Sequence, residues 1–330
     1  MNNSTPPLSI RKVIVLYNPF AGSGKSQKIA HEACTFIRKK NWQLVDCISS
    51  TYAGEIENKL ALHAAQHADL VILIGGDGTL RELVSGLLKH EQIPEIAFIP
   101  MGNANVVARE LKIPLNPLDA LHLLNSSGPV EVDVGLVHLN PQNRTNHEKI
   151  FLAMLEIGVG AKIVHMVNAL RLGKLKRLYQ VWGDLVYALA GLLAFAGKPL
   201  AQVKGKLFKD EHTGEVPFAS SHLVIANMRT YAKGWSFTPE ASCRDGRLDL
   251  AFSKRSSRLA ELAGFIAAAN QRKQSTRLMH YTQAQQVNLS TSTDLFMQID
   301  GDPVLFTGQA KISVLPKAFK LHAPRDCGYD

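Results

Sequence analysis

Residues 70–88, LVILIGGDGTLRELVSGLL, decide the fold of the first half of the chain. The opening run 70–74 is apolar without interruption, which is typical of a strand buried on both faces of a parallel sheet. After residues 75–79, apolar side chains recur at helical spacing, at Leu80, Leu83, Val84, Leu87 and Leu88. The stretch GGDGT therefore occupies the turn between a buried strand and an amphipathic helix.

The same alternation extends on both sides of this stretch. Further strands are expected at 13–17, 43–48 and 96–99, and helices at 26–40, 55–66 and 105–111. Repeated strand–helix units predict an α/β domain with a parallel sheet and helices on both of its faces.

From about Glu131 the pattern changes to many short strands. They are interrupted by two helical stretches, at 162–196 and 256–271. We expect a nucleotide-binding domain over residues 1–128 and a β-rich domain over 129–330, with a boundary at 126–129. The extreme C-terminus could return to the first domain.

Composition narrows the choice of partner and location. Lys and Arg outnumber Asp and Glu by 37 to 28, which favours an anionic partner without identifying it. No nucleic-acid-binding module is recognised. The longest apolar run, 185–196, would reach only about 20 Å as a helix, against the ~30 Å of a bilayer core. Four widely spaced cysteines suit reduced thiols, so we expect a cytoplasmic protein.

The GGDGT turn suits phosphate binding. Glycines let the backbone approach a phosphate closely, and the N–H groups at the start of the following helix attract an anion. The alternative is a tight turn without a ligand.

Two more loops follow strands in the same way. The loop 18–26, NPFAGSGKS, is not a Walker P-loop, because Pro19 stands where that motif requires glycine. Its Ser23 and Lys25 still suit an anion, although the loop could simply be flexible. In the loop 100–105, Asn103 and Asn105 are candidate ligands or plain helix caps. Loops at the carboxyl ends of neighbouring parallel strands converge on one crevice.

With these motifs the chain resembles the diacylglycerol kinase catalytic-domain family of bacterial soluble lipid kinases, related to sphingosine and ceramide kinases. The matched stretches are NPFAGSGK at 18–25, GGDGT at 75–79, GNANVVARELKIP at 102–114, DVG at 133–135, FLAMLEIGVGA at 151–161, DGRLDL at 245–250 and QIDGDP at 298–303. GGDGT alone is shared with NAD kinases and, more loosely, phosphofructokinases.

The resemblance implies a phosphofructokinase- or NAD-kinase-like α/β domain that holds ATP, followed by a β-rich sandwich for the acceptor. The nucleotide-binding residues that it implies, together with the two from the first loop, are Asn18, Ser23, Lys25, Thr51, Gly75, Gly76, Asp77, Gly78, Thr79, Glu82, Gly102, Asn103 and Asn105. It also implies a structural Mg²⁺ held by Asp245 and the carbonyls of Ser242 and Arg247. Without the resemblance, an ordinary hairpin turn would be preferred at Asp245.

The sequence departs from the family pattern at four positions. Arg81 replaces the usual Asn, Asn103 replaces a Thr, Arg244 replaces an acid, and Asp302 replaces a Glu. These changes bear on nucleotide contacts, on the metal and on the catalytic carboxylate.

The expected activity is ATP-dependent transfer of the γ-phosphoryl group to a lipid hydroxyl, with diacylglycerol as the first candidate. Asp77 is expected to organise the catalytic Mg²⁺, and Asp302 to accept the proton of the attacking hydroxyl, with Asp300 as second choice. A β-turn without catalytic function is the alternative at 300–302. Soluble-substrate NAD-kinase-like activity, or a nucleotide-binding regulator without turnover, would also fit.

The basic stretch 171–182 and the apolar run 185–196 form the candidate for peripheral contact with an anionic membrane. A core helix with a solvated basic face is the alternative. The sequence leaves the particular lipid and the oligomeric state open.

Overall fold

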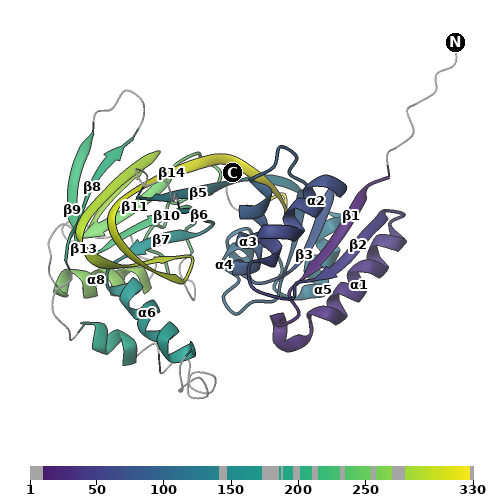
Figure 1. The fold of residues 1–330 in the computed structure, drawn as a ribbon, viewed down its shortest axis with the longest axis horizontal. Helices are drawn as coiled ribbons and strands as arrows, with labels where there is room; N and C mark the ends of the chain where they lie inside the picture. Colours follow the sequence, from purple (N-terminus) through teal and green to yellow (C-terminus); the bar gives the residue numbers. More distant parts are fainter. Residues whose placement is uncertain are drawn as a thin grey trace, which may run out of the picture. The chain divides into compact units, whose positions relative to one another are not determined.

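The computed structural model describes residues 10–140, 147–172, 186, 189–195, 201–209, 215–230, 235–253, 258–269 and 279–327. The chain divides into two compact units, which are treated separately here. Unit 1 comprises residues 1–132 and 318–330, and unit 2 comprises residues 133–317. Figure 1 shows the elements of both units in sequence colours.

Unit 1 is built on a parallel sheet with strand order β2-β1-β3-β4-β14. Its strands are β1 (Lys12–Tyr17), β2 (Gln43–Ser49), β3 (Leu70–Gly75), β4 (Glu95–Pro100) and the end of β14 (Asp302–Ala323), where Leu321 pairs with Ile96. Every residue of β3 is buried, as its continuous apolar run predicts.

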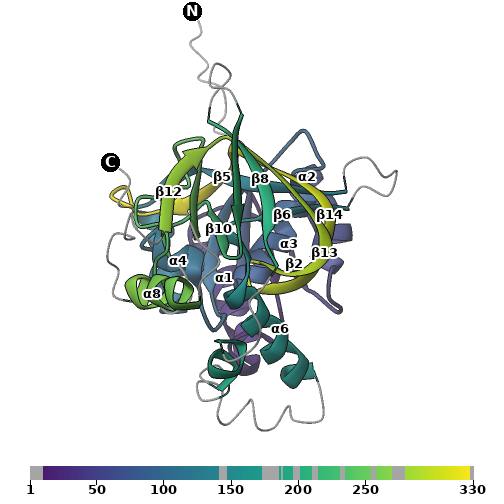
Figure 2. The same ribbon diagram turned by 90° about the vertical axis from the view of Figure 1, so that its left-hand side faces the viewer.

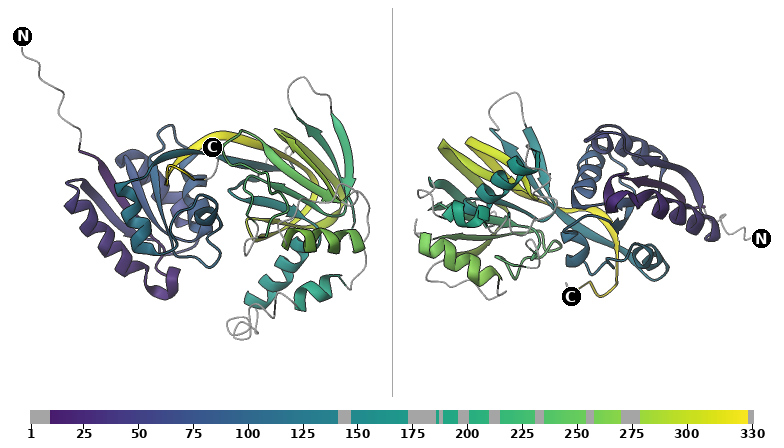
Figure 3. Two further views of the ribbon diagram at one scale, coloured as in Figure 1. Left: turned by 180° about the vertical axis from the view of Figure 1, so that it is seen from behind. Right: turned by 90° about the horizontal axis from the view of Figure 1, so that it is seen from below.

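Helices cover both faces of this sheet. They are α1 (Ser26–Lys39), η2 (Ile56–Leu60), α2 (Ala61–His67), α3 (Asp77–Leu87), α4 (Val106–Glu110), α5 (Pro117–His122) and the short turns η1 (Ala21–Gly24) and η3 (Leu123–Asn125). Helix α1 packs on β1, β2 and β3 and contacts α5, whereas α2 packs on α3. Helices α1 and α5 lie on one face of the sheet, and helices α2 and α3 lie on the other face (Figures 1 and 3).

The strand order creates a topological switch point within unit 1. The chain leaves β1 toward β2 on one side, and it leaves β3 toward β4 on the other side. Where two neighbouring parallel strands send their connections in opposite directions, a crevice opens outside their carboxyl ends. In unit 1 this switch point lies between the loop that begins at Asn18 and the loop that begins at Gly76.

Unit 2 is an antiparallel β-sandwich. Its strands are β5 (Gly128–Leu139), β6 (His147–Phe151), β7 (Met154–Ile157), β8 (Val203–Phe208), β9 (Val216–Ser220), β10 (Leu223–Ala226), β11 (Leu248–Ser253), β12 (Met279–Ala284), β13 (Gln286–Ile299) and most of β14. β13 changes register between Thr291 and Leu295, which lets its first part pair with β8 and its second part with β7.

Alternation of side chains along the strands gives unit 2 three layers. Leu223 and Ile225 of β10 face the apolar core formed by the strands of the sandwich. Val224 and Ala226 face the opposite way, into a second apolar cluster. That second cluster includes Phe265 of helix α8 (Arg258–Ala269) and Val159 of helix α6 (Val159–Leu172). The helices α6 and α8 lie on the same side of the strands (Figures 1 and 2).

The architecture confirms the predicted fold class, an α/β unit with a parallel sheet joined to a β-sandwich. The expected helix 162–196 is described at 159–172 and at 186 and 189–195, and most of the basic stretch 171–182 lies outside the described residues. In the part of the chain that the structure describes, no helix combines the length and apolar character needed to cross a bilayer.

Candidate nucleotide and acceptor sites

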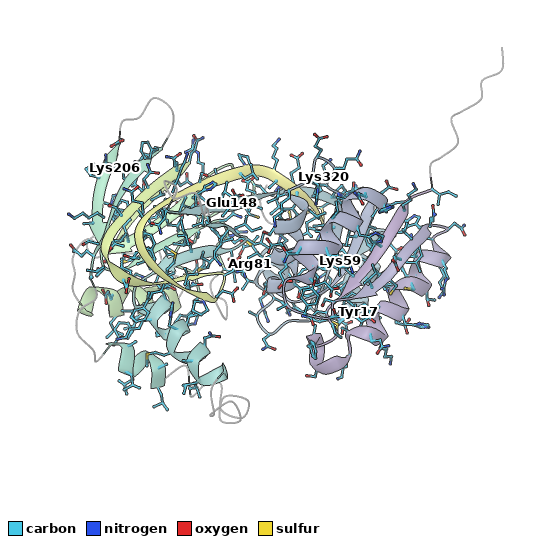
Figure 4. The ribbon with its side chains drawn as sticks, viewed as in Figure 1. Tyr17, Lys59, Arg81, Glu148, Lys206 and Lys320 are labelled. Carbon is cyan, nitrogen blue, oxygen red and sulfur yellow. The ribbon has the colours of Figure 1, made fainter. Side chains whose placement is uncertain are left out.

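Backbone hydrogen bonds connect the loops at the carboxyl edge of the sheet in unit 1. Asn18 N–H donates to the carbonyl of Ile74 at 3.0 Å, which joins the first loop to β3. Met101 N–H donates to the carbonyl of Gly75 at 2.7 Å, which joins β3 to the loop after β4. The parallel pairing of β1, β3 and β4 places all three loops at the same edge. Figure 4 labels Tyr17, the last residue of β1.

The loop after β1 also contacts the loop after β4. Gly22 N–H donates to the carbonyl of Met101 at 3.0 Å. Gly22, Ser23 and Gly24 have φ values of 58°, 57° and 85°, a left-handed conformation that glycine adopts at low cost. The side chains of Ser23 and Lys25 are exposed at this edge. Backbone hydrogen bonding therefore holds this loop in a defined turn, and phosphate binding by Ser23 and Lys25 stays a prediction.

The GGDGT turn and the 100–105 loop touch through their glycines. A Cβ atom built on Gly102 would lie 2.7 Å from the Cα of Gly76, and one built on Gly76 would lie 3.1 Å from the Cα of Gly102. At Gly78, by contrast, a built Cβ meets no atom within 4 Å, and the residue is exposed. Gly76 and Gly102 thus allow the two loops to pack closely, whereas Gly78 borders open space at the N-terminus of α3.

Asp77 links two helices. Its carboxylate accepts hydrogen bonds from the backbone N–H groups of Val106 at 3.0 Å and Val107 at 3.1 Å, at the start of α4. Burial raises the pKa of Asp77 above its usual value, although these N–H groups act in the opposite direction. Both carboxylate oxygens thus have a structural partner, so any metal that Asp77 organises would share them or bind through water.

Thr79 and Asn105 point back into the loops. A Cβ atom on Gly75 would lie 2.7 Å from the Thr79 side chain, and Asn18 Nδ2 lies 3.5 Å from Thr79 Oγ1. Asn105 has a φ of 49°, accepts from Gly102 N–H and donates to the Gly102 carbonyl, each at 2.9 Å. Both residues therefore shape the loops, whereas Asn103 is exposed beside them.

Thr51 lies at the same edge but uses its hydroxyl locally. Ser50 N–H donates to the carbonyl of Tyr17 at 3.0 Å, which places the loop after β2 beside the end of β1. The backbone N–H and the hydroxyl of Thr51 both donate to Glu55, and these hydrogen bonds lower the pKa of the Glu55 carboxyl. Glu82 is half-buried in the second turn of α3.

In unit 2, the turn between β13 and β14 is held by Asp300. Its carboxylate accepts backbone N–H groups of Leu152 at 2.7 Å and of Ala153 and Met154 at 2.9 Å. Asp300 itself has a φ of 48°, a conformation that Asp adopts more readily than most residues. Asp302 is exposed at the start of β14. The two carboxylates therefore have different environments, one fixed by amides and one open to solvent.

A second set of contacts holds the same turn from β13. Gln298 Oε1 accepts from Gly301 N–H at 2.6 Å, and Gln298 Nε2 donates to Glu156 Oε2 at 3.2 Å. Glu156 is fully buried on β7, and a Cβ atom on Gly160 would lie 1.9 Å from its Oε1. The chain of contacts Glu156–Gln298–Gly301 links a buried carboxylate to the DGDP turn.

His222 lies next to this chain of contacts. Its Nδ1 is 3.7 Å from Glu156 Oε1, and its ring is fully buried near Phe237 and Phe265. Neither ring nitrogen has a hydrogen-bond partner among the described residues. Burial lowers the pKa of His222 to about 4, so the imidazole is neutral at neutral pH.

The proposed metal turn, 242–247, is fixed by Asp133. Its carboxylate accepts from Gly246 N–H at 2.8 Å and from Lys317 N–H at 2.7 Å. Asp245 Oδ1 accepts from Arg247 N–H at 3.0 Å. Burial, with a smaller contribution from the charge of Asp133, raises the pKa of Asp245. The Asp245 side chain is exposed, and its carboxylate oxygens are the kind of ligand that a hard metal ion prefers.

Sequence reasoning named most residues of the loops, but it missed the residues whose hydrogen bonds fix the positions of those loops. Asp133 contacts a residue distant in sequence, and Met101 and Gln298 contact backbone N–H or C=O groups, which single-sequence patterns do not show. Glu55 holds Thr51 from only four residues away, through its hydroxyl and its backbone N–H. In the described part of the chain, no three His, Cys, Asp or Glu side chains form a metal-binding group. A metal at Asp245 would therefore depend on backbone carbonyls.

Comparison with known families and structures agrees with the two-unit fold. Residues 12–137 match the diacylglycerol kinase catalytic domain, and residues 153–323 match the YegS C-terminal NAD kinase beta sandwich-like domain. The two matched domains are those of a kinase family, and the second is NAD kinase-like in its fold. More particularly, the chain belongs to the diacylglycerol kinase catalytic-domain family, which confirms the resemblance.

Relatives extend the match over most of the chain. A diacylglycerol kinase of Staphylococcus aureus is 26% identical over 300 residues, covering 88% of this chain and 86% of the relative. A Bacillus anthracis protein assigned as a diacylglycerol kinase has a similar crystal structure, with a TM-score of 0.73, 22% identity and coverage of 96% and 98%. Yeast NADH kinase complexed with NADH aligns with a TM-score of 0.52 at 10% identity, covering 98% of this chain and 89% of that one. The two structural likenesses concern the fold.

Proposed function

We propose that the protein is an ATP-dependent lipid kinase that transfers the γ-phosphoryl group to a lipid hydroxyl, with diacylglycerol as the first candidate acceptor. The observation that carries the proposal is the switch point of unit 1, where the N-terminus of α3 meets two other glycine loops. Family membership supports phosphoryl transfer as the reaction class.

In this proposal, unit 1 binds the triphosphate. The open space at Gly78 and the N-terminus of α3 would receive phosphate oxygens, since backbone N–H groups and the helix dipole favour an anion there. Lys25 and Ser23 would add a cation and a hydroxyl from the loop after β1. The contacts of Gly76 with Gly102 and of Asp77 with Val106 would keep the loops in position before ATP arrives.

Unit 2 would supply the proton acceptor. A general base must be able to reach the attacking hydroxyl. Asp302 is exposed, whereas Asp300 holds three backbone N–H groups, and this difference supports Asp302 as the base and Asp300 as the residue that positions the turn.

Magnesium would enter in two ways. The ion that accompanies ATP would neutralise charge on the transferred phosphoryl group, and Asp77 would organise it through water or a shared oxygen. A structural ion would be held by the carboxylate of Asp245 and the carbonyls of Ser242 and Arg247. A lipid substrate would require peripheral contact with a membrane, and the excess of Lys and Arg over Asp and Glu favours an anionic one.

A soluble acceptor is the second candidate function. The fold likeness to yeast NADH kinase favours it, and the GGDGT loop alone would serve either acceptor. A regulator that binds nucleotide without turnover is the third, motivated by Arg81, Asn103 and Arg244.

One experiment separates these candidates. The purified full chain is incubated with γ-labelled ATP and Mg²⁺ together with diacylglycerol, ceramide, sphingosine or NAD, each in the same detergent micelles. A labelled lipid product supports the proposal, and its identity names the acceptor. Labelled NADP would replace the proposal with a soluble-substrate kinase. ATP binding without any labelled product would replace it with a regulator.

A further inference from the structure

Two helices of unit 2 expose large apolar side chains. In the helix at 189–195, Leu189, Leu192 and Leu193 are 51%, 68% and 60% exposed. In α8, Leu262 and Ile266 are 42% and 56% exposed. We call these residues the apolar surface. A helix that is apolar on every side is expected to be covered on every side.

The opposite sides of both helices are already covered. Val186 and Ala190 are buried with Val167 of α6, and Ala194 is buried with Phe265 and Ala268 of α8. The two helices meet where the rings of Phe195 and Phe265 lie 5.6 Å apart, edge to face. Leu192 and Leu262 each lie one turn before these rings. The apolar surface is therefore presented by two helices that are packed against each other and against the sandwich.

This surface carries no exposed acidic group in the described residues of its two helices. Residues 189–195 contain no charge, and residues 258–269 contain only Arg258 and Glu261. Glu261 is 2% exposed and accepts a hydrogen bond from Ser221 Oγ at 2.6 Å. The acidic member of α8 thus lies on the buried side.

The sequence on either side of each helix is strongly basic. The flanking cations are Arg171, Lys174, Lys176, Arg177, Lys198, Lys254, Arg255, Arg272, Lys273 and Arg277, against the single acid Asp184 over the same stretches. An apolar helix face with basic flanks suits the interface of an anionic bilayer, where acyl chains receive the apolar side chains and lipid phosphates attract the cations. A second copy of the chain would instead bring two basic sets together.

We propose that Leu189, Leu192, Leu193, Leu262 and Ile266 form the surface that inserts into an anionic lipid bilayer. The inference rests on the proposed function, because a lipid acceptor must be reached at a membrane. It goes further by naming the inserting side chains. In the described residues 189–195, one face of the helix is in the core and the other is exposed and apolar, so a core helix can also present a surface to a membrane.

The test is flotation of the full chain with vesicles of phosphatidylcholine that contain about a third phosphatidylglycerol. Two double variants, Leu192→Ser with Leu193→Ser and Leu262→Ser with Ile266→Ser, should each reduce the partition coefficient about tenfold, because inserted apolar area is lost. The matched control, Leu115→Ser with Leu118→Ser, replaces side chains that are 40% and 43% exposed in unit 1 and should leave binding unchanged.

Vesicle binding needs no phosphoryl transfer, so its outcome is independent of the lipid-kinase assay in micelles. Loss of flotation in both double variants, with unchanged thermal unfolding, supports the inference whether or not a lipid is phosphorylated. Flotation equal to wild type in either double variant overturns it. If the variants instead turn a dimer into a monomer and still bind vesicles, the surface is a contact between copies and the inference is wrong.

Discussion

Gly102 lies directly against Gly76: a Cβ atom on Gly102 would be 2.7 Å from the Cα of Gly76, closer than two carbon atoms can approach without a shift of backbone. The contact joins the turn after β3 to the loop after β4, the two loops whose residues Asp77 and Val106 are also hydrogen-bonded. The geometry of the proposed phosphate site therefore depends on the absence of two side chains.

Replacing Gly102 by Ala should force these loops apart. We expect at least a tenfold loss of ATP affinity, measured by isothermal titration calorimetry, and a modest fall in the melting temperature. Gly76→Ala should act in the same direction. Gly128→Ala, where a built Cβ meets nothing within 4 Å, is the neutral control.

Gly78→Ala separates packing from ligand binding. Because its Cβ would enter open space, the fold should be unchanged. If phosphate occupies that space, ATP affinity should fall about tenfold or more at constant melting temperature. Normal ATP binding in Gly78→Ala would show that the nucleotide lies elsewhere.

Asp77→Ala should affect both stability and activity. Loss of the acceptor for the N–H groups of Val106 and Val107 should cost about 1–3 kcal/mol of unfolding free energy, read from denaturant titration. Asp77→Asn keeps one acceptor oxygen and should cost less. If Asp77 also organises Mg²⁺, the Asn variant should need more Mg²⁺ for half-maximal activity, and an unchanged requirement would leave Asp77 with a structural role alone.

The two carboxylates of the DGDP turn should respond differently to Asn. Asp302→Asn should lower kcat by about 10²–10⁴ at constant stability and ATP affinity, because an amide cannot accept the proton. Asp300→Asn should lower stability, because an amide NH₂ group would face one of the three N–H donors from Leu152, Ala153 and Met154. Single-turnover kinetics and calorimetry measure the two effects. A dead, stable Asp300→Asn beside a normal Asp302→Asn would reverse the assignment.

Gln298 should act on the turn without contacting substrate. Gln298→Leu removes the acceptor for Gly301 N–H, so kcat should fall about 10-fold or more while the dissociation constant for ATP stays constant. Glu156→Gln keeps an acceptor for Gln298 Nε2 and should retain more activity than Glu156→Ala. The exposed Gln285→Leu is the control. Equal losses in ATP affinity and kcat would indicate general unfolding instead of positioning.

His222 should make unit 2 sensitive to acid. Its folded pKa of about 4 lies below the ordinary 6.5, so the unfolded chain binds the proton more strongly between these values and stability falls as the pH is lowered through them. The stabilising contribution is complete above pH 6.5, and about 3 kcal/mol is lost by pH 4. His222→Phe should remove this loss in denaturant titrations from pH 4 to 7, whereas the exposed His31→Phe should not. An unchanged pH dependence in His222→Phe would assign the proton uptake to other groups.

Periodicity and loop position predicted the fold class and placed the three glycine loops at one edge of a parallel sheet. This succeeded because the burial of β3 and the amphipathic pattern of α3 are local properties of residues 70–88. The family resemblance, and not periodicity, assigned Asp77 and Thr79 to the nucleotide site. Both side chains contact protein partners in the structure, and their contact with a nucleotide stays a prediction.

What could not be predicted depends on contacts between distant segments. Asp133 meets Gly246 and Lys317, and Gln298 meets Glu156, in each case across more than a hundred residues. Such pairs are set by tertiary packing, for which one sequence has no periodic signal. The sequence shows residues 189–195 only as part of a continuous apolar run. The structure separates the exposed leucines of this helix from its buried residues Ala190 and Ala194.

Strand β14 has a consequence for how the chain reaches its native state. Leu321 completes the sheet of unit 1 beside Ile96, and His322 contacts Glu95 at 2.8 Å and Ser127 at 3.1 Å. During synthesis these residues leave the ribosome only after all of unit 2 has been made. Until then, β4 has an unpaired edge, so the sheet of unit 1 stays incomplete while residues 133–317 are being synthesised. A chain arrested after residue 317 would lack the end of β14 and would leave that edge of β4 unpaired.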